Sequence, residues 1–206
     1  QALRTPAFYC IYFGHAFNSM LIVTITTHLA LLMTDQEISL QMSAWVVTVY
    51  TGISMVFQVV GGYIGDRAPK NVVIFIFSAI QAGSVLIITT NDSLAAAFAF
   101  AVAFGIGFGG RTPLTVAIRG DYFGRKAFAS IMGLSMVPMN FCLLAAPLLT
   151  AIYHDARDSY VLPFNVLAVI CFLGGVLFLL AKKPTLSSPL QISSQRPDLP
   201  ARQAER

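Results

Sequence analysis

Residues 94–118 read LAAAFAFAVAFGIGFGGRTPLTVAI, an apolar run with a single charge, Arg111. A helix needs about 20 such residues to cross the roughly 30 Å hydrocarbon core of a bilayer. Five further runs occur between short polar turns, so the predicted spans are residues 6–33, 42–64, 71–90, 94–118, 127–153 and 160–181. Because the runs are continuous and do not alternate, they favour helices over barrel strands. The expected fold class is an all-α membrane protein with six transmembrane helices.

The composition of the whole chain supports a membrane protein. Of its 206 residues, 56% are hydrophobic and 11% are charged, whereas a typical soluble domain has about 25% charged residues. The formal net charge is +4, but the basic residues stand at the ends of apolar runs, which is a topology signal and not a nucleic-acid surface. The three cysteines lie in apolar runs without metal-ligand spacing. We expect a lipid bilayer as partner, no nucleic acid and no cofactor.

Lys and Arg are distributed unevenly between the two sides of the predicted bundle. One side holds only Arg157, whereas the other holds every remaining Lys and Arg except Arg111, which lies within a span. Such an excess marks the cytoplasmic side. We therefore expect a multi-pass protein of the cell membrane with both ends of this segment in the cytoplasm. Residues 1–183 form the predicted transmembrane domain, and the Pro- and Ser-rich residues 184–206 a disordered cytoplasmic tail.

The turn after the second predicted span reads Gly61-Gly62-Tyr63-Ile64-Gly65-Asp66-Arg67-Ala68-Pro69-Lys70. This stretch resembles the cytoplasmic loop signature of the major facilitator superfamily, with Pro69 in place of the usual glycine. A second segment, Arg119-Gly120-Asp121-Tyr122-Phe123-Gly124-Arg125-Lys126, is similar to a loop in the branch of oxalate/formate antiporters and monocarboxylate transporters. The resemblance implies helices seven to twelve, one half-bundle of a twelve-helix facilitator fold. The missing N-terminal six-helix half would belong to the same chain or to a partner.

The same two segments supply the candidate gating residues. Asp66 is expected to face the positive N-terminal end of the helix that starts near Ala127, and Arg67 and Lys70 to pair with Asp121. Such contacts would hold a cytoplasmic gate shut in one state and part in the other; alternatively, the charges only anchor the loop and set topology. Three glycines of the first segment are expected to let helices approach closely: Gly61, Gly62 and Gly65. The gating set is Gly62, Asp66, Arg67, Lys70, Asp121 and Arg125.

Arg111 stands out because an arginine at the centre of a membrane helix costs roughly 2.5–3.5 kcal/mol. No Asp or Glu lies within the predicted spans to pair with it, and Pro113 interrupts the helix nearby, as is typical of transporter sites. A planar guanidinium suits a carboxylate, so Arg111 is the first candidate to bind an anionic substrate group. Two alternatives stay open: it snorkels to the cytoplasmic face, or it pairs with an acid in the missing half.

Weaker candidates for substrate binding are polar residues of other spans, namely His15, His28, Gln58 and Asn140. His15 and His28 lie about 220° apart around their helix, so we do not expect them to line one site. Each is more typical of a hydrogen-bonded packing histidine than of a proton carrier. If protons drive transport, the carrier is one of these histidines or a carboxylate of the missing half. The branch resembled here has a basic residue in its eighth helix, and residues 42–64 contain none.

The resemblance implies a secondary active transporter that works by alternating access, with a small organic anion such as a monocarboxylate as its small-molecule substrate. One alternative is an exporter of drugs or other metabolites with a broad, apolar preference. Another is a non-transporting membrane scaffold or sensor, which predicts no solute flux and a polar stripe buried in helix contacts. An enzyme is not expected, because the spans contain no acid–base pair or metal cluster.

Overall fold

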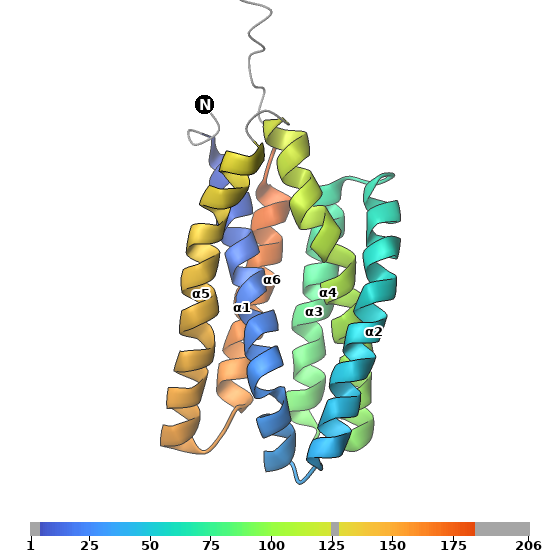
Figure 1. Cartoon of the computed structure of the whole chain (residues 1–206), viewed down its shortest axis with the longest axis vertical. Helices are drawn as coiled ribbons and strands as arrows, with labels where there is room; N and C mark the ends of the chain where they lie inside the picture. The colour runs from blue at the N-terminus through green and yellow to red at the C-terminus, as the bar shows by residue number, and fades with distance from the viewer. Residues whose placement is uncertain (1–4, 125–127, 184–206) are drawn as a thin grey trace, which may run out of the picture.

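The computed structural model describes residues 5–124 and 128–183, which fold into six α-helices. These are α1 (Pro6–Asp35), α2 (Leu40–Gly65), α3 (Lys70–Thr90), α4 (Leu94–Phe123), α5 (Phe128–Arg157) and α6 (Val161–Leu180), as Figure 1 shows. All six are long and apolar enough to cross a membrane. The predicted all-α membrane fold with six spanning helices is therefore confirmed.

Local sequence signals fix several of the helix ends. Pro6 occupies the first turn of α1, where the N–H that it lacks has no partner within the helix. Ser39 and Ser93 cap α2 and α4, and each hydroxyl oxygen accepts the backbone N–H three residues further on. Gly124 follows α4 with a φ of 77°, a backbone conformation that favours glycine and ends the helix.

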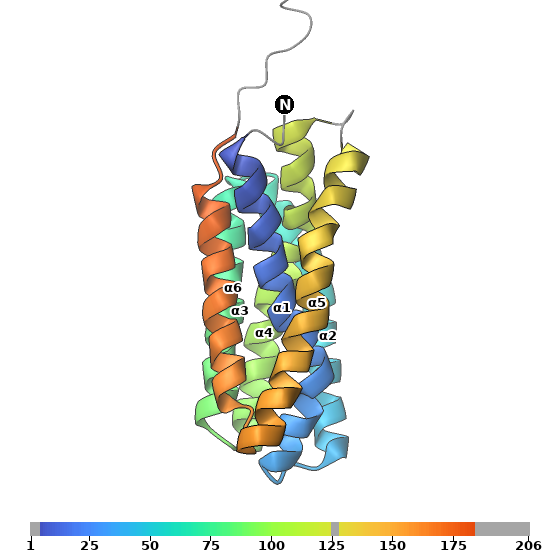
Figure 2. The same cartoon turned by 90° about the vertical axis from the view of Figure 1, so that its left-hand side faces the viewer.

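The six helices lie in three layers of two (Figures 1 and 2). α3 and α6 form one outer layer, α1 and α4 the middle layer, and α2 and α5 the other outer layer. α1 packs mainly against α5 and α6, and α4 packs in the corresponding way against α2 and α3. The first three helices thus repeat the packing of the last three in the opposite direction, which is the inverted repeat found in transporter folds.

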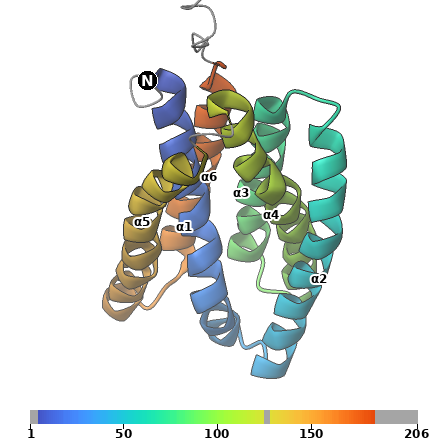
Figure 3. The same cartoon turned by 45° about the horizontal axis from the view of Figure 1, so that its top comes forward.

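α2 and α5 are the least covered helices. They lie at opposite edges of the α1–α4 pair (Figure 3), and each packs chiefly against one neighbour. Their free faces are apolar, and side chains such as Val59 and Phe141 are more than two-thirds exposed. Contiguous apolar surface of this kind suits contact with lipid or with further helices.

Glycines allow two helices to contact the backbone of α4. A Cβ on Gly61 of α2 would overlap the carbonyl of Gly110, and a Cβ on Gly107 would overlap Gln81 of α3. Small residues at such contacts let membrane helices approach closely. The turn of α4 that carries Arg111 is therefore held from two sides.

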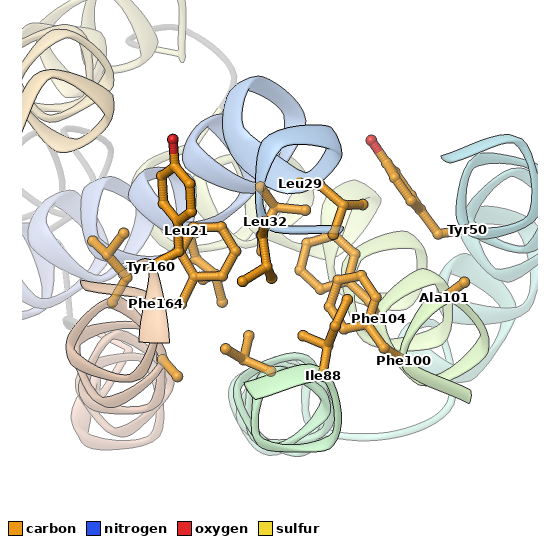
Figure 4. Packing of buried hydrophobic residues seen from close by; sticks show 14 of the residues in the cluster. Leu21, Leu29, Leu32, Tyr50, Ile88, Phe100, Ala101, Phe104, Tyr160 and Phe164 are labelled. Atoms are coloured by element: carbon orange, nitrogen blue, oxygen red, sulfur yellow. The ribbon is translucent and has the colours of Figure 1, made fainter. Parts of the chain in front are cut away.

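Two buried apolar clusters fill the bundle. Figure 4 shows part of the larger one, in which Phe104 of α4 lies with Leu29 of α1 and Ile88 of α3. The second cluster includes Ile11 of α1 and Phe178 of α6. Along α1, α3 and α4, the polar residues Asn18, Gln81 and Arg111 lie between these two clusters.

The prediction that a turn begins at residue 119 is wrong. α4 continues through Arg119 and Asp121 to Phe123, and α5 likewise continues past residue 153 to Arg157. The buried Arg119 is tolerated inside the bundle because its guanidinium hydrogen-bonds to residues of α1 and α5. The predicted tail, residues 184–206, lies outside the described residues.

Candidate functional site

Arg111 lies near the middle of α4, about 18 Å from the helix end at Phe123 with ~1.5 Å rise per residue. Its side chain is only 2% exposed. Its Nε donates to Gln81 Oε1 of α3 at 2.6 Å, and its Nη2 donates to the backbone oxygen of Asn18 in α1 at 3.0 Å. The guanidinium therefore points into the bundle. The alternative that it snorkels to the cytoplasmic face does not hold.

Asn18 extends this network to α6. Its amide nitrogen donates to the backbone oxygen of Gly14 at 2.9 Å, and Cys171 Sγ donates to its Oδ1 at 3.1 Å. Gln81 is fully buried, and its Nε2 has no partner in the part of the chain that the structure describes. Arg111 Nη1 makes no hydrogen bond there either. Arg111 and Gln81, which are hydrogen-bonded to each other, thus each keep one donor group free for an acceptor.

Arg119 is a second buried cation, which the sequence reasoning missed. It is 0% exposed and lies about 6 Å from the end of α4. Its Nη2 donates to His15 Nδ1 of α1 at 2.7 Å, its Nε to Ser135 Oγ of α5 at 3.4 Å, and its Nη1 to the backbone oxygen of Thr115 one turn earlier. All three guanidinium nitrogens therefore have protein partners, and α4 is tied to α1 and α5.

The sequence did contain a signal for Arg119. Gly124 is a typical residue just beyond a helix C-terminus, and Leu114, Ile118 and Phe123 continue the buried apolar side of α4 past the predicted end of the span. Arg119 was counted with the basic residues of a cytoplasmic loop, because a charge at the end of an apolar run usually marks the membrane surface.

The two histidines of α1 do not share a site. His15 contacts Arg119 and is partly exposed. His28 Nε2 donates to the backbone oxygen of Pro147 in α5 at 3.1 Å, and its ring lies 5.5 Å from that of Tyr160. Its Nδ1 is buried and has no partner among the described residues. The hydrogen bond to α5 and the contact with Tyr160 are those expected of a packing histidine.

Gln58 and Asn140 do not join Arg111. Gln58 is exposed on α2. Asn140 is exposed on α5, where it lines a shallow hollow of about 350 Å³ with Val137, Phe141 and Leu144. Both amides therefore lie on the surface of the six-helix bundle, on its two least covered helices.

The gating residues lie at the end of the bundle that carries the α2–α3 turn (Figure 1). Lys70 Nζ lies 2.9 Å from Asp121 Oδ2 and joins the start of α3 to the end of α4. Arg67 does not pair with Asp121, because its guanidinium lies 3.6 Å from the centre of the Tyr63 ring and donates to the Tyr63 backbone oxygen at 3.2 Å. The side chain of Asp66 is exposed at the end of α2.

Gly62 does not mediate close contact between the described helices, so its predicted role stays a prediction. A Cβ at Gly62 would meet open space, whereas one at Gly61 or Gly65 would overlap α4. Gly62 is one residue further round α2 than Gly61 and therefore faces away from the contact. Arg125 lies outside the described residues.

The site's chemistry is that of hydrogen-bond donors in an apolar interior. Within residues 5–124 and 128–183, neither buried arginine has a carboxylate partner, and no three His, Cys, Asp or Glu side chains gather to hold a metal ion. Two uncompensated guanidiniums favour a nearby anion, because charges interact strongly where water is excluded. Six spanning helices in an inverted repeat around these cations define a multi-pass membrane protein with the architecture of a transporter.

Comparison with known proteins gives the family. A family model described as the Major Facilitator Superfamily matches residues 8–203, and the chain belongs to this family. Its members are transport proteins and not enzymes. No curated protein matches the chain.

Two solved structures are similar to this chain. A mutant of the peptide transporter POT, in complex with alafosfalin, has a TM-score of 0.74 at 16% identity over 91% of this chain. The POT family transporter PepTSo has a TM-score of 0.72 at 20% identity over 97% of it. This chain covers 42% and 44% of those two chains, which is less than half their length. At these identities the likeness establishes the fold alone.

Proposed function

We propose that this chain is one half of a secondary active transporter that works by alternating access. The family, the inverted repeat of three helices and the partial coverage of longer transporters support this. Two such bundles rock around a mid-membrane site and expose it to each side in turn. The loop resemblance assigns this chain to helices seven to twelve, in the branch of oxalate/formate antiporters and monocarboxylate transporters.

The other half packs, in this proposal, on the open side of the bundle formed by α2, α5 and the α1–α4 pair between them. The exposed apolar surfaces of α2 and α5 support that arrangement. It would also place the surface amides of Gln58 and Asn140 next to the substrate path. The asymmetry of Lys and Arg supports a location in the cell membrane with both ends of this segment in the cytoplasm.

The proposed substrate is a small organic anion such as a monocarboxylate. The observation that carries this proposal is Arg111, a buried mid-membrane cation that pairs with no carboxylate among the described residues and keeps Nη1 free. A carboxylate that reached Nη1 would gain a charge-assisted hydrogen bond, and Gln81 Nε2 is a second donor without a partner among the described residues. Gln81 Nε2 is buried, so an anion could reach it only if helices part during the transport cycle.

Uptake by the full-length protein in proteoliposomes tests this proposal. Labelled formate, oxalate and lactate are offered to the wild type, Arg111→Lys and Arg111→Gln. We expect Arg111→Gln to lower kcat/KM at least tenfold, about 1.4 kcal/mol, and Arg111→Lys to lose most transport because an ammonium lacks the planar fork. Arg157→Gln, on the exposed opposite end, is the control and should transport normally. Unchanged substrate affinity in a folded Arg111→Gln would refute the anion site.

The exposed charges at the α2–α3 turn form the proposed gate. The Lys70–Asp121 pair joins α3 to α4 at the mouth of the bundle, and Asp66 lies at the end of the neighbouring helix. An ion pair between helix ends can form in one conformation and break in the other. This supports a role in the balance between inward- and outward-facing states.

A second candidate function is a non-transporting membrane scaffold or sensor. It is favoured by the burial of the polar stripe, since Arg111 and Arg119 are bonded to neighbouring helices inside the bundle. The same vesicles decide between the two functions. Flux of any labelled anion that depends on Arg111 excludes the scaffold, and absence of flux for every offered solute supports it.

A further inference from the structure

The hydrogen bond between Arg119 and His15 fixes the protonation state of the imidazole. A guanidinium only donates, so His15 Nδ1, 2.7 Å from Arg119 Nη2, must accept with its lone pair. The ring is therefore neutral in this arrangement, with its one proton on Nε2. Nε2 makes no hydrogen bond to another described residue, and the side chain is partly exposed. Water can therefore exchange protons with the ring.

His28, on the same helix, is bonded in the opposite sense. A backbone carbonyl only accepts, so His28 Nε2 donates to Pro147 at 3.1 Å. A proton added to His28 Nδ1 leaves that bond intact. A proton added to His15 occupies the lone pair that holds Arg119. Of the two histidines, only His15 loses a contact between helices when it is protonated.

The charges around His15 oppose a protonated ring in this arrangement. α4 presents two guanidiniums to it, Arg119 directly and Arg111 from further away. α5 contributes the hydroxyl of Ser135, bonded to the same guanidinium, and α6 offers the thiol of Cys171 one turn further along α1. No ion pair within the described residues brings a carboxylate to this cluster. An imidazolium here would meet only like charge, which is costly in a low-dielectric interior.

We infer that His15 is the proton-binding site of this half of the protein, and that proton uptake at Nδ1 releases α1 from Arg119. Hydronium in the surrounding water supplies the proton: its O–H bond breaks to leave a water molecule, the Nδ1–H bond forms, and the hydrogen bond from Arg119 is lost. Because proton binding and the α1–α4 contact exclude each other, they are thermodynamically linked. The inference rests on the proposed function to the extent that it names the proton as the coupling ion.

The separation of α1 from the α3–α4 unit tests the inference. Spin labels are placed at Tyr9→Cys and Val72→Cys, two exposed positions, in full-length protein in lipid nanodiscs. Serine replaces the native Cys10, Cys142 and Cys171. A free imidazole takes up its proton near about pH 6.5, and the neighbouring guanidiniums disfavour the imidazolium. We therefore expect the label distance to lengthen only as the pH falls below about 6.5, by about 2 Å or more, the size of helix shifts in switching proteins.

Two variants of α1 make the test specific. His15→Gln keeps an oxygen that accepts from Arg119 but does not titrate, so the distance should stay short at every pH. His28→Gln is the matched control on the same helix and should keep the full wild-type response. A response that survives His15→Gln, or that disappears in His28→Gln, overturns the inference.

Imidazole ¹⁵N spectra of the wild type report the protonation state of His15 directly, so this test does not depend on whether a variant folds. His15 should be the neutral Nε2–H form at about pH 8 and an imidazolium where the label distance is long. A proton on Nδ1 at high pH, or titration of His15 without a change in distance, overturns the inference. Both readouts work without substrate. Loss of the pH response with intact carboxylate uptake refutes the proton site alone, and absence of uptake with an intact pH response refutes the proposed transport alone.

Discussion

Arg111 and Arg119 lie about two turns apart on α4, and both are buried, yet their surroundings differ. Arg119 places all three guanidinium nitrogens on partners from α1, α4 and α5. Arg111 places two and keeps Nη1 free, and the amide nitrogen of its partner Gln81 is also unpartnered among the described residues. A fully bonded cation adds to the stability of the bundle, whereas a partly bonded one keeps capacity for a ligand. The comparison therefore assigns helix association to Arg119 and anion binding to Arg111.

Substitution of Arg119 should have the largest effect on stability. Arg119→Gln removes charge-assisted hydrogen bonds to two neighbouring helices, α1 and α5, each worth roughly 1.5–3 kcal/mol net, so we expect a loss of at least about 3 kcal/mol. Thermal unfolding in detergent measures it. Arg111→Gln should cost less, because the desolvation of its unpartnered Nη1 already offsets part of what its two hydrogen bonds contribute. The assignment fails if Arg111→Gln unfolds at the lower temperature of the two.

A double-mutant cycle separates the contact from the general cost of losing a buried charge. His15→Leu, Arg119→Gln and their combination are compared with the wild type. The double variant should be less destabilised than the sum of the single variants by roughly 0.5–3 kcal/mol, the usual range for directly bonded residues. Strict additivity would show that the Arg119–His15 hydrogen bond adds nothing to stability.

The contrast between the two arginines also shows what the sequence could reveal. The six helices follow from run length and composition, and Arg111 stands out because it interrupts an apolar run. Arg119 does not stand out, because a charge at the end of such a run is normally a surface residue. Its burial depends on two partners that are distant in the sequence: His15, more than 100 positions away, and Ser135, 16 positions away. Such tertiary contacts are not encoded in local periodicity.

The charges of the α2–α3 turn also show that a sequence alone does not predict which side chains pair. The sequence predicts that Lys70 and Arg67 both pair with Asp121, because opposite charges lie on two neighbouring segments. Lys70 reaches Asp121, whereas Arg67 lies on the ring of Tyr63, four residues earlier in the last turn of α2. Neighbours at i and i+4 share a helix face, so a local partner competes with the distant one. Which of two partners a side chain contacts depends on three-dimensional geometry that a single sequence does not show.

Gln81 should give an intermediate effect and sharpen the role of Arg111. Gln81→Leu keeps the side-chain volume, removes the orphaned Nε2 and leaves Arg111 Nε without its acceptor at 2.6 Å. We expect a loss of about 1 kcal/mol, the lower end for an unpaired buried donor, and a fall in carboxylate uptake. Ser84→Ala is the matched control on α3, because its hydroxyl donates only to the backbone of Gln81 within the helix. Normal uptake in Gln81→Leu would separate this amide from the anion site.

The exposed pair at the end of α4 should give the smallest change in stability. Lys70 and Asp121 are 21% and 49% exposed, and pairs of this kind contribute roughly 0.2–1 kcal/mol. Lys70→Gln should therefore leave the unfolding temperature nearly unchanged. A gate needs little energy, however, because about 1.4 kcal/mol already shifts a two-state ratio tenfold. We expect Lys70→Gln and Asp66→Asn to shift the inward/outward balance, read by the accessibility of cysteines introduced on α5.

Arg67→Gln provides the matched control for the gate. Arg67 lies in the α2–α3 turn close to Lys70 but contacts Tyr63 of α2, so its loss should not change the balance. If Arg67→Gln shifts accessibility as much as Lys70→Gln, the charge of the turn acts through its general field and not through the ion pair. Salt distinguishes the two cases further, because screening of exposed charges acts over about 8–10 Å at physiological ionic strength. If none of the three variants shifts accessibility, these charges set topology alone, and the buried contacts of Arg119 remain as the device that closes this end of the bundle.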